Sequence, residues 1–211
     1  MVISIYLSLN PFFINGTSFA RMDAPSSAMF APQFLPMETT FEAYIAREYE
    51  FLNRFGLGIS RSGIGLFWYS INVEEEFLNA FFLGMNFGEF AVSVGYADVL
   101  EAGVGFKRKF QYFNVCAYAG LYGDRLGYGC VFSDYGSGIA GVELMVQEGY
   151  PIDYRFYGDY ETDYDIRLFV SYETLSRSFR IGLSYRFFTI AYGENRYLGP
   201  SYYYGMRLRR K

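Results

Sequence analysis

Apolar and polar residues alternate with a period of two through most of the chain from about Gly88 onward. In one segment the apolar positions are Phe90, Val92, Val94 and Tyr96. The same alternation recurs in segments 100–106, 113–121, 140–146, 164–172, 179–187 and 202–208. Successive side chains of a β-strand point to opposite faces, so each segment is expected to be a strand with one apolar and one polar or small face. Strands of about ten residues joined by short turns are typical of an up-and-down meander.

Turn-forming residues fall between the predicted strands. Turns are expected at Ala97-Asp98, Gly123-Asp124, Asp134-Tyr135-Gly136 and Gly158-Asp159. Upstream, the pattern predicts a hairpin around Arg61-Ser62-Gly63 and a strand from Phe77 to Asn86. Segment 39–55 has partial helical spacing but also fits a strand, which we favour. The whole pattern predicts about 12 to 14 strands, and closure favours an even number.

The alternation fits two kinds of β-protein, in which the apolar face has opposite orientations. A soluble β-barrel that carries a lipid turns this face inward, whereas an outer-membrane barrel turns it toward lipid. Several apolar faces end in aromatic residues, as expected of aromatic girdles at the two headgroup zones; examples are Tyr96, Phe106, Tyr172 and Phe187. The other face is rich in Gly, Ser and Ala, which suits a small lumen. We therefore predict an all-β, antiparallel, up-and-down transmembrane β-barrel with short loops, located in the cell outer membrane; the soluble barrel is the alternative.

Charged residues of both signs occupy the face opposite the apolar one and are expected to line the lumen. If the loop is Thr174 to Arg177, Asp165 falls opposite Arg186 and the two charges pair. Because Arg dominates the later strands, the set could bias a path toward anions. The alternative, which we favour because small barrels are filled by side chains, is that the charges pair and only stabilise the barrel. The predicted lumen-lining residues are Glu101, Lys107, Glu143, Asp165, Arg167, Arg180, Arg186, Arg207 and Arg209.

Composition narrows the functional classes. The 211 residues fit one domain, or two small ones, and the net charge of −4 argues against a nucleic-acid partner. The chain has no histidine, which excludes Ser-His-Asp and Cys-His catalysis, and its two cysteines match no zinc finger. We expect no enzymatic activity, no cofactor and no metal site. Beyond residues 1–20, no segment reaches the roughly 18 unbroken apolar residues of a spanning helix.

An acidic, tyrosine-rich run surrounds Tyr160. Its carboxylates are oxygen ligands of the kind that Ca²⁺ prefers, but their spacing matches no fixed ligand pattern. We favour a solvated turn over a calcium site. The acidic residues are Asp153, Asp159, Glu161, Asp163 and Asp165.

The N-terminus has features of an export signal. Residues 1–20 are largely apolar and end in Ser18-Phe19-Ala20, with small residues where a signal peptidase cleaves. However, no Lys or Arg precedes Arg21, and Asn10-Pro11 interrupts the apolar stretch. A first β-strand or a truncated start is the alternative. We divide the chain into a signal peptide (1–20), an N-terminal segment (21–38) and the β-barrel (39–211).

Cys116 and Cys130 lie in strand-like runs on either side of Gly123-Asp124. With a loop centred on Gly123, the two cysteines face each other across a hairpin and form a disulfide in an oxidising compartment. The alternative is two small buried thiols. A shift of the register by one residue would separate the pair.

Two stretches resemble the outer-membrane barrel superfamily that contains the FadL-type transporters of hydrophobic compounds and the PorV-like proteins. The first is Ala20-Arg21 followed by Ser26-Ser27-Ala28-Met29-Phe30-Ala31-Pro32; the second runs from Arg180 to Phe187 and continues through Ala191-Tyr192 to Arg209. The chain departs from that pattern at Pro32, which lacks Asn, Ala and Gly neighbours, and at Ser26-Ser27, where a glycine pair is expected. Its last residues are Leu208-Arg209-Arg210-Lys211 instead of a terminal aromatic residue. The resemblance implies a barrel of about 14 strands, at the upper end of the predicted number.

We expect a narrow pore or a conduit for small compounds, and only the resemblance suggests that these are hydrophobic. The alternatives are a structural barrel that docks other envelope proteins and a soluble lipid-binding barrel. Membrane lipid is the expected partner, with lipopolysaccharide or other envelope proteins as further candidates.

Overall fold

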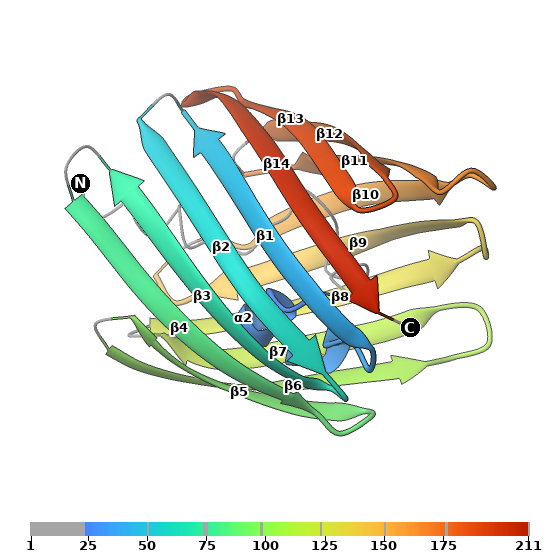
Figure 1. The fold of residues 1–211 in the computed structure, drawn as a ribbon, viewed down its shortest axis with the longest axis horizontal. Helices are drawn as coiled ribbons and strands as arrows, with labels where there is room; N and C mark the ends of the chain where they lie inside the picture. The colour runs from blue at the N-terminus through green and yellow to red at the C-terminus, as the bar shows by residue number, and fades with distance from the viewer. Residues whose placement is uncertain are drawn as a thin grey trace.

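The computed structural model describes residues 24–49, 51–73, 76–97, 99–122, 124–149, 151–175 and 177–210. Fourteen strands form one closed antiparallel barrel in which each strand pairs with its sequence neighbours and β1 pairs with β14 (Figure 1). The predicted up-and-down barrel is confirmed, with a strand number at the top of the expected range. The strands are β1 (Thr39–Glu48), β2 (Leu52–Arg61), β3 (Ile64–Val73), β4 (Glu76–Asn86), β5 (Phe90–Ala97), β6 (Val99–Lys109), β7 (Asn114–Tyr122), β8 (Asp124–Asp134), β9 (Gly138–Gln147), β10 (Asp153–Glu161), β11 (Ile166–Glu173), β12 (Ser178–Tyr185), β13 (Phe188–Asn195) and β14 (Gly199–Arg210).

Closure is what makes this sheet compatible with lipid. Hydrocarbon offers no hydrogen bonds, and each unpaired backbone group of an open edge would cost several kcal/mol. The ten paired positions between β1 and β14, from Thr39↔Arg210 to Glu48↔Ser201, remove that edge.

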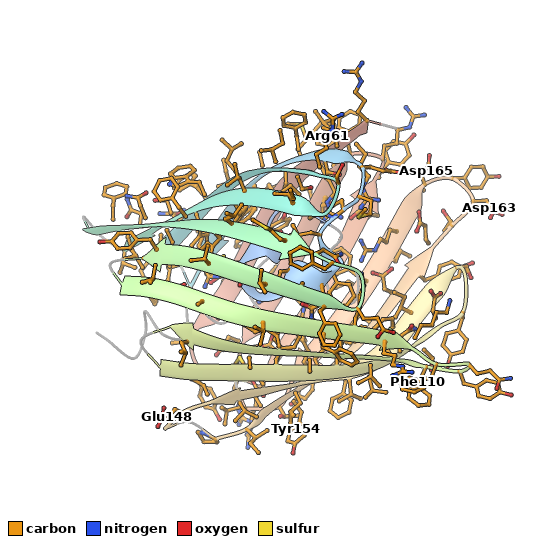
Figure 2. The ribbon with its side chains drawn as sticks, turned by 90° about the horizontal axis from the view of Figure 1, so that it is seen from below. Arg61, Phe110, Glu148, Tyr154, Asp163 and Asp165 are labelled. Atoms are coloured by element: carbon orange, nitrogen blue, oxygen red, sulfur yellow. A yellow bond between two sulfur atoms is a disulfide. The ribbon has the colours of Figure 1, made fainter. Side chains whose placement is uncertain are left out.

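The connections between strands are short, and they define two ends of the barrel. The terminal end contains Thr39, Arg210 and turns such as 162–165 and 186–187. The distal end contains Glu48, Glu148 and Asp153. Figure 2 shows Phe110, Asp163 and Asp165 at one end and Glu148 at the other.

The apolar face of the strands points outward, as an outer-membrane barrel requires. Val104, Leu168 and Ile181 are 59%, 48% and 55% exposed, whereas Arg180 is only 6% exposed. The soluble alternative needs the reverse orientation, so the structure contradicts it. Aromatic residues also lie outward near strand ends; Phe90 on β5 and Phe106 on β6 are one such pair, with ring centroids 5.3 Å apart.

The strand favoured over a helix in segment 39–55 is confirmed, but the segment forms two strands, because the chain reverses at Tyr49, which adopts a φ of 56° without a glycine or proline to mark the turn. One turn prediction is wrong: Gly158-Asp159 lies inside β10, and the turn follows at 162–165. Asp159 is tolerated in the strand because Arg167 on β11 neutralises its buried carboxylate.

Candidate functional site: the barrel lumen

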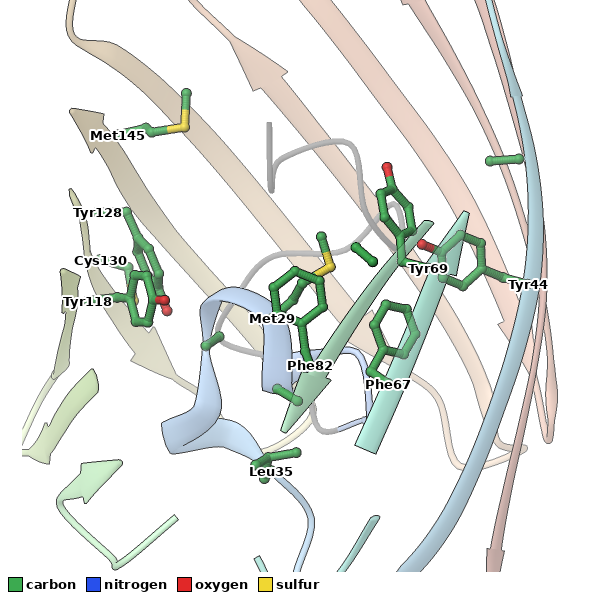
Figure 3. Packing of buried hydrophobic residues seen from close by; sticks show 14 of the residues in the cluster. Met29, Leu35, Tyr44, Phe67, Tyr69, Phe82, Tyr118, Tyr128, Cys130 and Met145 are labelled. Atoms are coloured by element: carbon green, nitrogen blue, oxygen red, sulfur yellow. The ribbon is translucent and has the colours of Figure 1, made fainter. Parts of the chain in front are cut away.

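An N-terminal segment, residues 24–36, lies inside the barrel, and we call it the plug; Met37 and Glu38, which follow it, are exposed. It contains the short helices α2 (Ser27–Phe30) and η3 (Pro32–Phe34), which pack against β3, β4, β5 and β6. Figure 3 shows the plug between Phe67 and Phe82 on one side and Tyr118 and Tyr128 on the other. No helix in the described ranges is long and apolar enough to cross a membrane. The sequence predicted a separate N-terminal segment but not its place in the lumen.

Glycines on the inner wall make room for the plug. A Cβ at Gly84 would lie 2.8 Å from Leu35 Cδ1 and 2.9 Å from the Cα of Ala28. Such contacts are closer than van der Waals packing allows, so only glycine fits while the plug is in place. On neighbouring strands, a Cβ at Gly58, Gly65 or Gly105 would also meet the plug, at Pro25, Leu35 or Gln33, respectively. The wall formed by β2, β3, β4 and β6 is therefore shaped to receive this segment.

Hydrogen bonds tie the plug to strands around the barrel. The backbone N–H of Ser26 donates to Glu42 Oε2 on β1 at 2.9 Å. Gln33 is held from several sides: its Nε2 donates to Tyr128 Oη at 2.8 Å, and its carbonyl accepts from Asn86 Nδ2 at 3.0 Å and from Lys107 Nζ. Because these partners sit on four different strands, the plug has a defined position in the lumen.

The opposite part of the lumen wall carries buried ion pairs near the distal end. Arg155 on β10 lies between Glu143 on β9, at 3.5 Å, and Glu173 on β11, at 4.0 Å. All three side chains are at most 2% exposed. On β1 and β2, Glu48 and Arg54 form a second pair at 2.6 Å. Each charge is compensated, which a narrow low-dielectric interior requires.

Ion pairs also occur near the terminal end. Arg167 on β11 donates through Nε to Asp159 Oδ2 at 2.6 Å. Arg207 on β14 lies 3.9 Å from Glu42 Oε1, so Glu42 contacts both the wall and the plug. These charges are less completely buried than the distal ones, since the side chain of Arg207 is 23% exposed.

The sequence-predicted lumen residues divide into two groups. Inward-facing and at least partly buried are Glu101, Lys107, Glu143, Arg167, Arg180 and Arg207. Arg209 lies on the same face of β14 but is exposed at the terminal end. Asp165 and Arg186 lie in turns and are exposed, each with a positive φ.

The register that was expected to pair Asp165 with Arg186 is present. Ile166 pairs with Tyr185, and the Arg186 N–H donates to the Asp165 carbonyl at 3.3 Å. Here β11 begins two residues later and β12 ends two residues earlier than expected, so Asp165 and Arg186 belong to the rim and do not line the lumen wall.

Several luminal charges were missed by the sequence analysis. A usable signal exists for some of them, because they alternate with outward apolar neighbours on their strand; Arg155, for example, lies between Tyr154 and Phe156. The missed residues are Glu42, Glu48, Arg54, Arg155, Asp159 and Glu173.

Cys116 on β7 and Cys130 on β8 are register partners and form a disulfide, with Cα atoms 5.1 Å apart. Both are buried on the inner face, two residues from the stacked pair Tyr118 and Tyr128. The register is the one expected from a loop centred on Gly123.

The acidic run does not act as a unit. Asp153 and Asp159 are buried on the inner face of β10, whereas Asp163 and Asp165 are exposed in the following turn. Asp153 accepts hydrogen bonds from Thr174 Oγ1 and from the Leu175 N–H. Among the described residues, no cluster of acidic or cysteine side chains is arranged to hold a metal ion.

The fold resembles solved outer-membrane proteins. The outer membrane protein Omp33 of Acinetobacter baumannii superposes with a TM-score of 0.59 at 6% sequence identity, over 82% of this chain and 98% of that one. The KdgM porin superposes with a TM-score of 0.52 at 12% identity, over 82% of this chain and 99% of that one. No protein-family model and no curated protein matches the sequence. The structural likeness establishes the fold of an outer-membrane β-barrel; a specific likeness to FadL-type or PorV-like proteins is not among these matches.

Proposed function

We propose that this chain is a narrow outer-membrane channel for small polar solutes, and that the plug closes it in the conformation described. The lumen offers two different walls. One wall, on β2, β3, β4 and β6, fits the plug through glycines, and the other, on β9 to β11, β14 and β1, carries ion pairs, one of which reaches Arg54 on β2. A solute that passed between them would meet charges of both signs.

The observation that carries the proposal is the set of luminal ion pairs, of which Arg167 and Arg207 near the terminal end keep 13% and 23% of their side chains exposed. Replacing a buried ion pair by apolar side chains of similar volume is often neutral or stabilising, by about 1–4 kcal/mol. A barrel that served only as a rigid body would therefore gain nothing from these charges. In a channel, these charged side chains would line a polar path through the membrane.

The same polar wall gives less support to transport of hydrophobic compounds, which rests on the resemblance to FadL-type transporters alone. A second candidate is a structural barrel that docks other envelope proteins. The complete burial of Glu143 and Arg155 favours it, because it leaves this level of the lumen closed.

Conductance across planar lipid bilayers separates the two functions. The folded protein is first identified by its heat-modifiable gel mobility and then added to the bilayer. We expect small, flickering current steps from the intact chain, and larger, longer steps from a variant that lacks residues 24–36. Where the deletion impairs folding, Asn86→Ala replaces it, because, of the plug's attachments, this change removes only the hydrogen bonds from Asn86 Nδ2 to the carbonyls of Gln33 and Leu35. If neither the intact chain nor the folded variants conduct, the channel is refuted and the structural barrel takes its place.

A further inference from the structure

One luminal carboxylate differs from all the others described. Glu101 on β6 is only 4% exposed, and its Oε2 atom has no hydrogen-bond partner. Within the described ranges no cation lies within ion-pairing distance of Glu101, whereas Glu48, Glu143 and Glu173 each have an arginine. Burying a charged group without a partner is costly, so the position calls for a counter-charge.

The nearest luminal lysine on the same strand is already engaged. Lys107 lies six residues further along β6, and its Nζ donates to the carbonyl of Gln33 in the plug. Its ammonium also lies 5.5 Å from the centre of the Phe34 ring. Lys107 therefore binds a carbonyl of the plug and does not pair with Glu101.

Aromatic rings border Glu101 on two sides. Its register partner on β5 is Gly95, and the ring of Phe82 on β4 occupies the space that a Cβ at Gly95 would fill. Gly103 follows on the same face of β6, and the ring of Tyr118 on β7 covers it in the same way. Because Gly95 and Gly103 have no side chains, the Phe82 ring can lie over the position opposite Glu101 on β5. The Tyr118 ring can lie over the next inward position on β6.

Tyr118 is fixed in this position. Its hydroxyl lies 3.2 Å from Ser93 Oγ, and its ring stacks on Tyr128 with centroids 5.6 Å apart. A fixed ring loses little conformational entropy when a ligand binds to it. The Tyr118 ring is therefore preorganised for binding a ligand.

We propose that Glu101, Phe82 and Tyr118 form a binding site for a small organic ammonium ion in the lumen. The carboxylate supplies the opposite charge, and aromatic faces attract cations through their quadrupole. A metal cation would instead require several oxygen ligands. Among described residues, the inner-face neighbours of Glu101 on β5 and β6 are Ser93, Gly95, Ala97 and Gly103, and the single side-chain oxygen among them, Ser93 Oγ, lies 3.2 Å from the Tyr118 hydroxyl. The site deepens the proposed channel by giving it a substrate class.

Binding is tested without any current measurement. Tetramethylammonium chloride is the probe, and saturation-transfer NMR follows its methyl signal in the presence of the folded barrel in detergent micelles. We expect transfer to the probe from the intact chain and about a tenfold weaker affinity in Glu101→Gln, which removes the charge but keeps the shape. Phe82→Leu should weaken binding by a smaller factor while leaving the charge in place. Glu148→Gln is the matched control, because Glu148 is exposed in the turn after β9.

Each outcome decides the proposal. Equal transfer in the intact chain, Glu101→Gln and Phe82→Leu would overturn it, as would absence of transfer in the intact chain. Displacement of the probe by equimolar sodium would overturn the organic class in favour of a metal cation. Heat-modifiable mobility checks that each variant is folded. Binding without conductance would leave the site standing and refute only the channel, so the two failures are distinguishable.

Discussion

The carboxylate of Glu42 accepts a hydrogen bond of 2.9 Å from the backbone N–H of Ser26. Glu42 belongs to the wall and Ser26 to the plug, so this bond joins the two parts whose separation would open the lumen. Arg207 lies on the other side of the same carboxylate, at 3.9 Å. Glu42 thus binds Arg207, which is part of the wall, and Ser26, which would move away with the plug.

Replacing Glu42 by Gln should favour the open state. Hydrogen bonds to charged groups contribute about 1.5–3 kcal/mol, and a loss of about 1.4 kcal/mol changes an equilibrium tenfold. We therefore expect the ratio of open to closed time in single-channel recordings to rise about tenfold. Glu148→Gln, in an exposed turn, is the control and should behave like the intact chain. An unchanged ratio in Glu42→Gln would show that this bond does not hold the plug.

Gly84→Val should destabilise the barrel with its plug in place. The added Cβ would lie 2.8 Å from Leu35 Cδ1 and 2.9 Å from the backbone of Ala28, which cannot move without shifting the plug. Overpacking of this kind costs about 1–3 kcal/mol, measured as a lower urea midpoint of the folded barrel in micelles. The control is Gly158→Ala, whose Cβ would lie 3.8 Å from its nearest neighbour. Equal midpoints for the two variants would argue against a resident plug.

Arg155→Met should be among the most damaging luminal substitutions. It leaves Glu143 and Glu173 buried without their shared cation, at a cost of about 3–5 kcal/mol. Adding Glu143→Gln should recover part of the loss, because one uncompensated charge is then removed. Urea unfolding of the single and double variants measures both effects, and Arg196→Met, in an exposed turn, is the control. A double variant less stable than Arg155→Met would contradict the pairing.

The Cys116–Cys130 disulfide predicts a specific pattern of thiol chemistry. Unfolded, unreduced protein should not react with a maleimide reagent, and both cysteines should react after reduction. Because the bond closes a short loop, with a sequence separation of 14, the Cys116→Ser/Cys130→Ser variant should lose about 2–3 kcal/mol of unfolding free energy. Maleimide labelling of unreduced protein would show that the two thiols are free.

The sequence predicted the barrel and its orientation because each strand carries the same signal. Alternation places Val104, Leu168 and Ile181 on one face, and lipid exposure requires that this face be apolar over the whole circumference. Short turns with few alternative lengths also fixed the registers, and this is why the pairing of Cys116 with Cys130 could be foreseen.

The lumen could be predicted only in part. The plug lacks periodicity, and its small residues, such as Ser26, Ala28 and Pro32, would fit an exposed segment equally well. The barrel wall that contacts the plug is lined by glycines such as Gly84, and their role is visible only once the plug residues they contact are in place. The partner of a luminal charge is also set by register between strands, so the isolation of Glu101 becomes visible only when the neighbouring strands are in place.

The outward orientation of the apolar face is tested most directly at Trp68, the chain's single tryptophan. Trp68 alternates on β3 with the buried Phe67 and Tyr69, and it pairs with Leu57 and Phe81, which are exposed on the outer face. In bilayers whose acyl chains carry bromine, we predict strong quenching of the Trp68 fluorescence, and little quenching by iodide in the water. Quenching by iodide without quenching by brominated lipid would place Trp68 in water and contradict a lipid-facing outer surface.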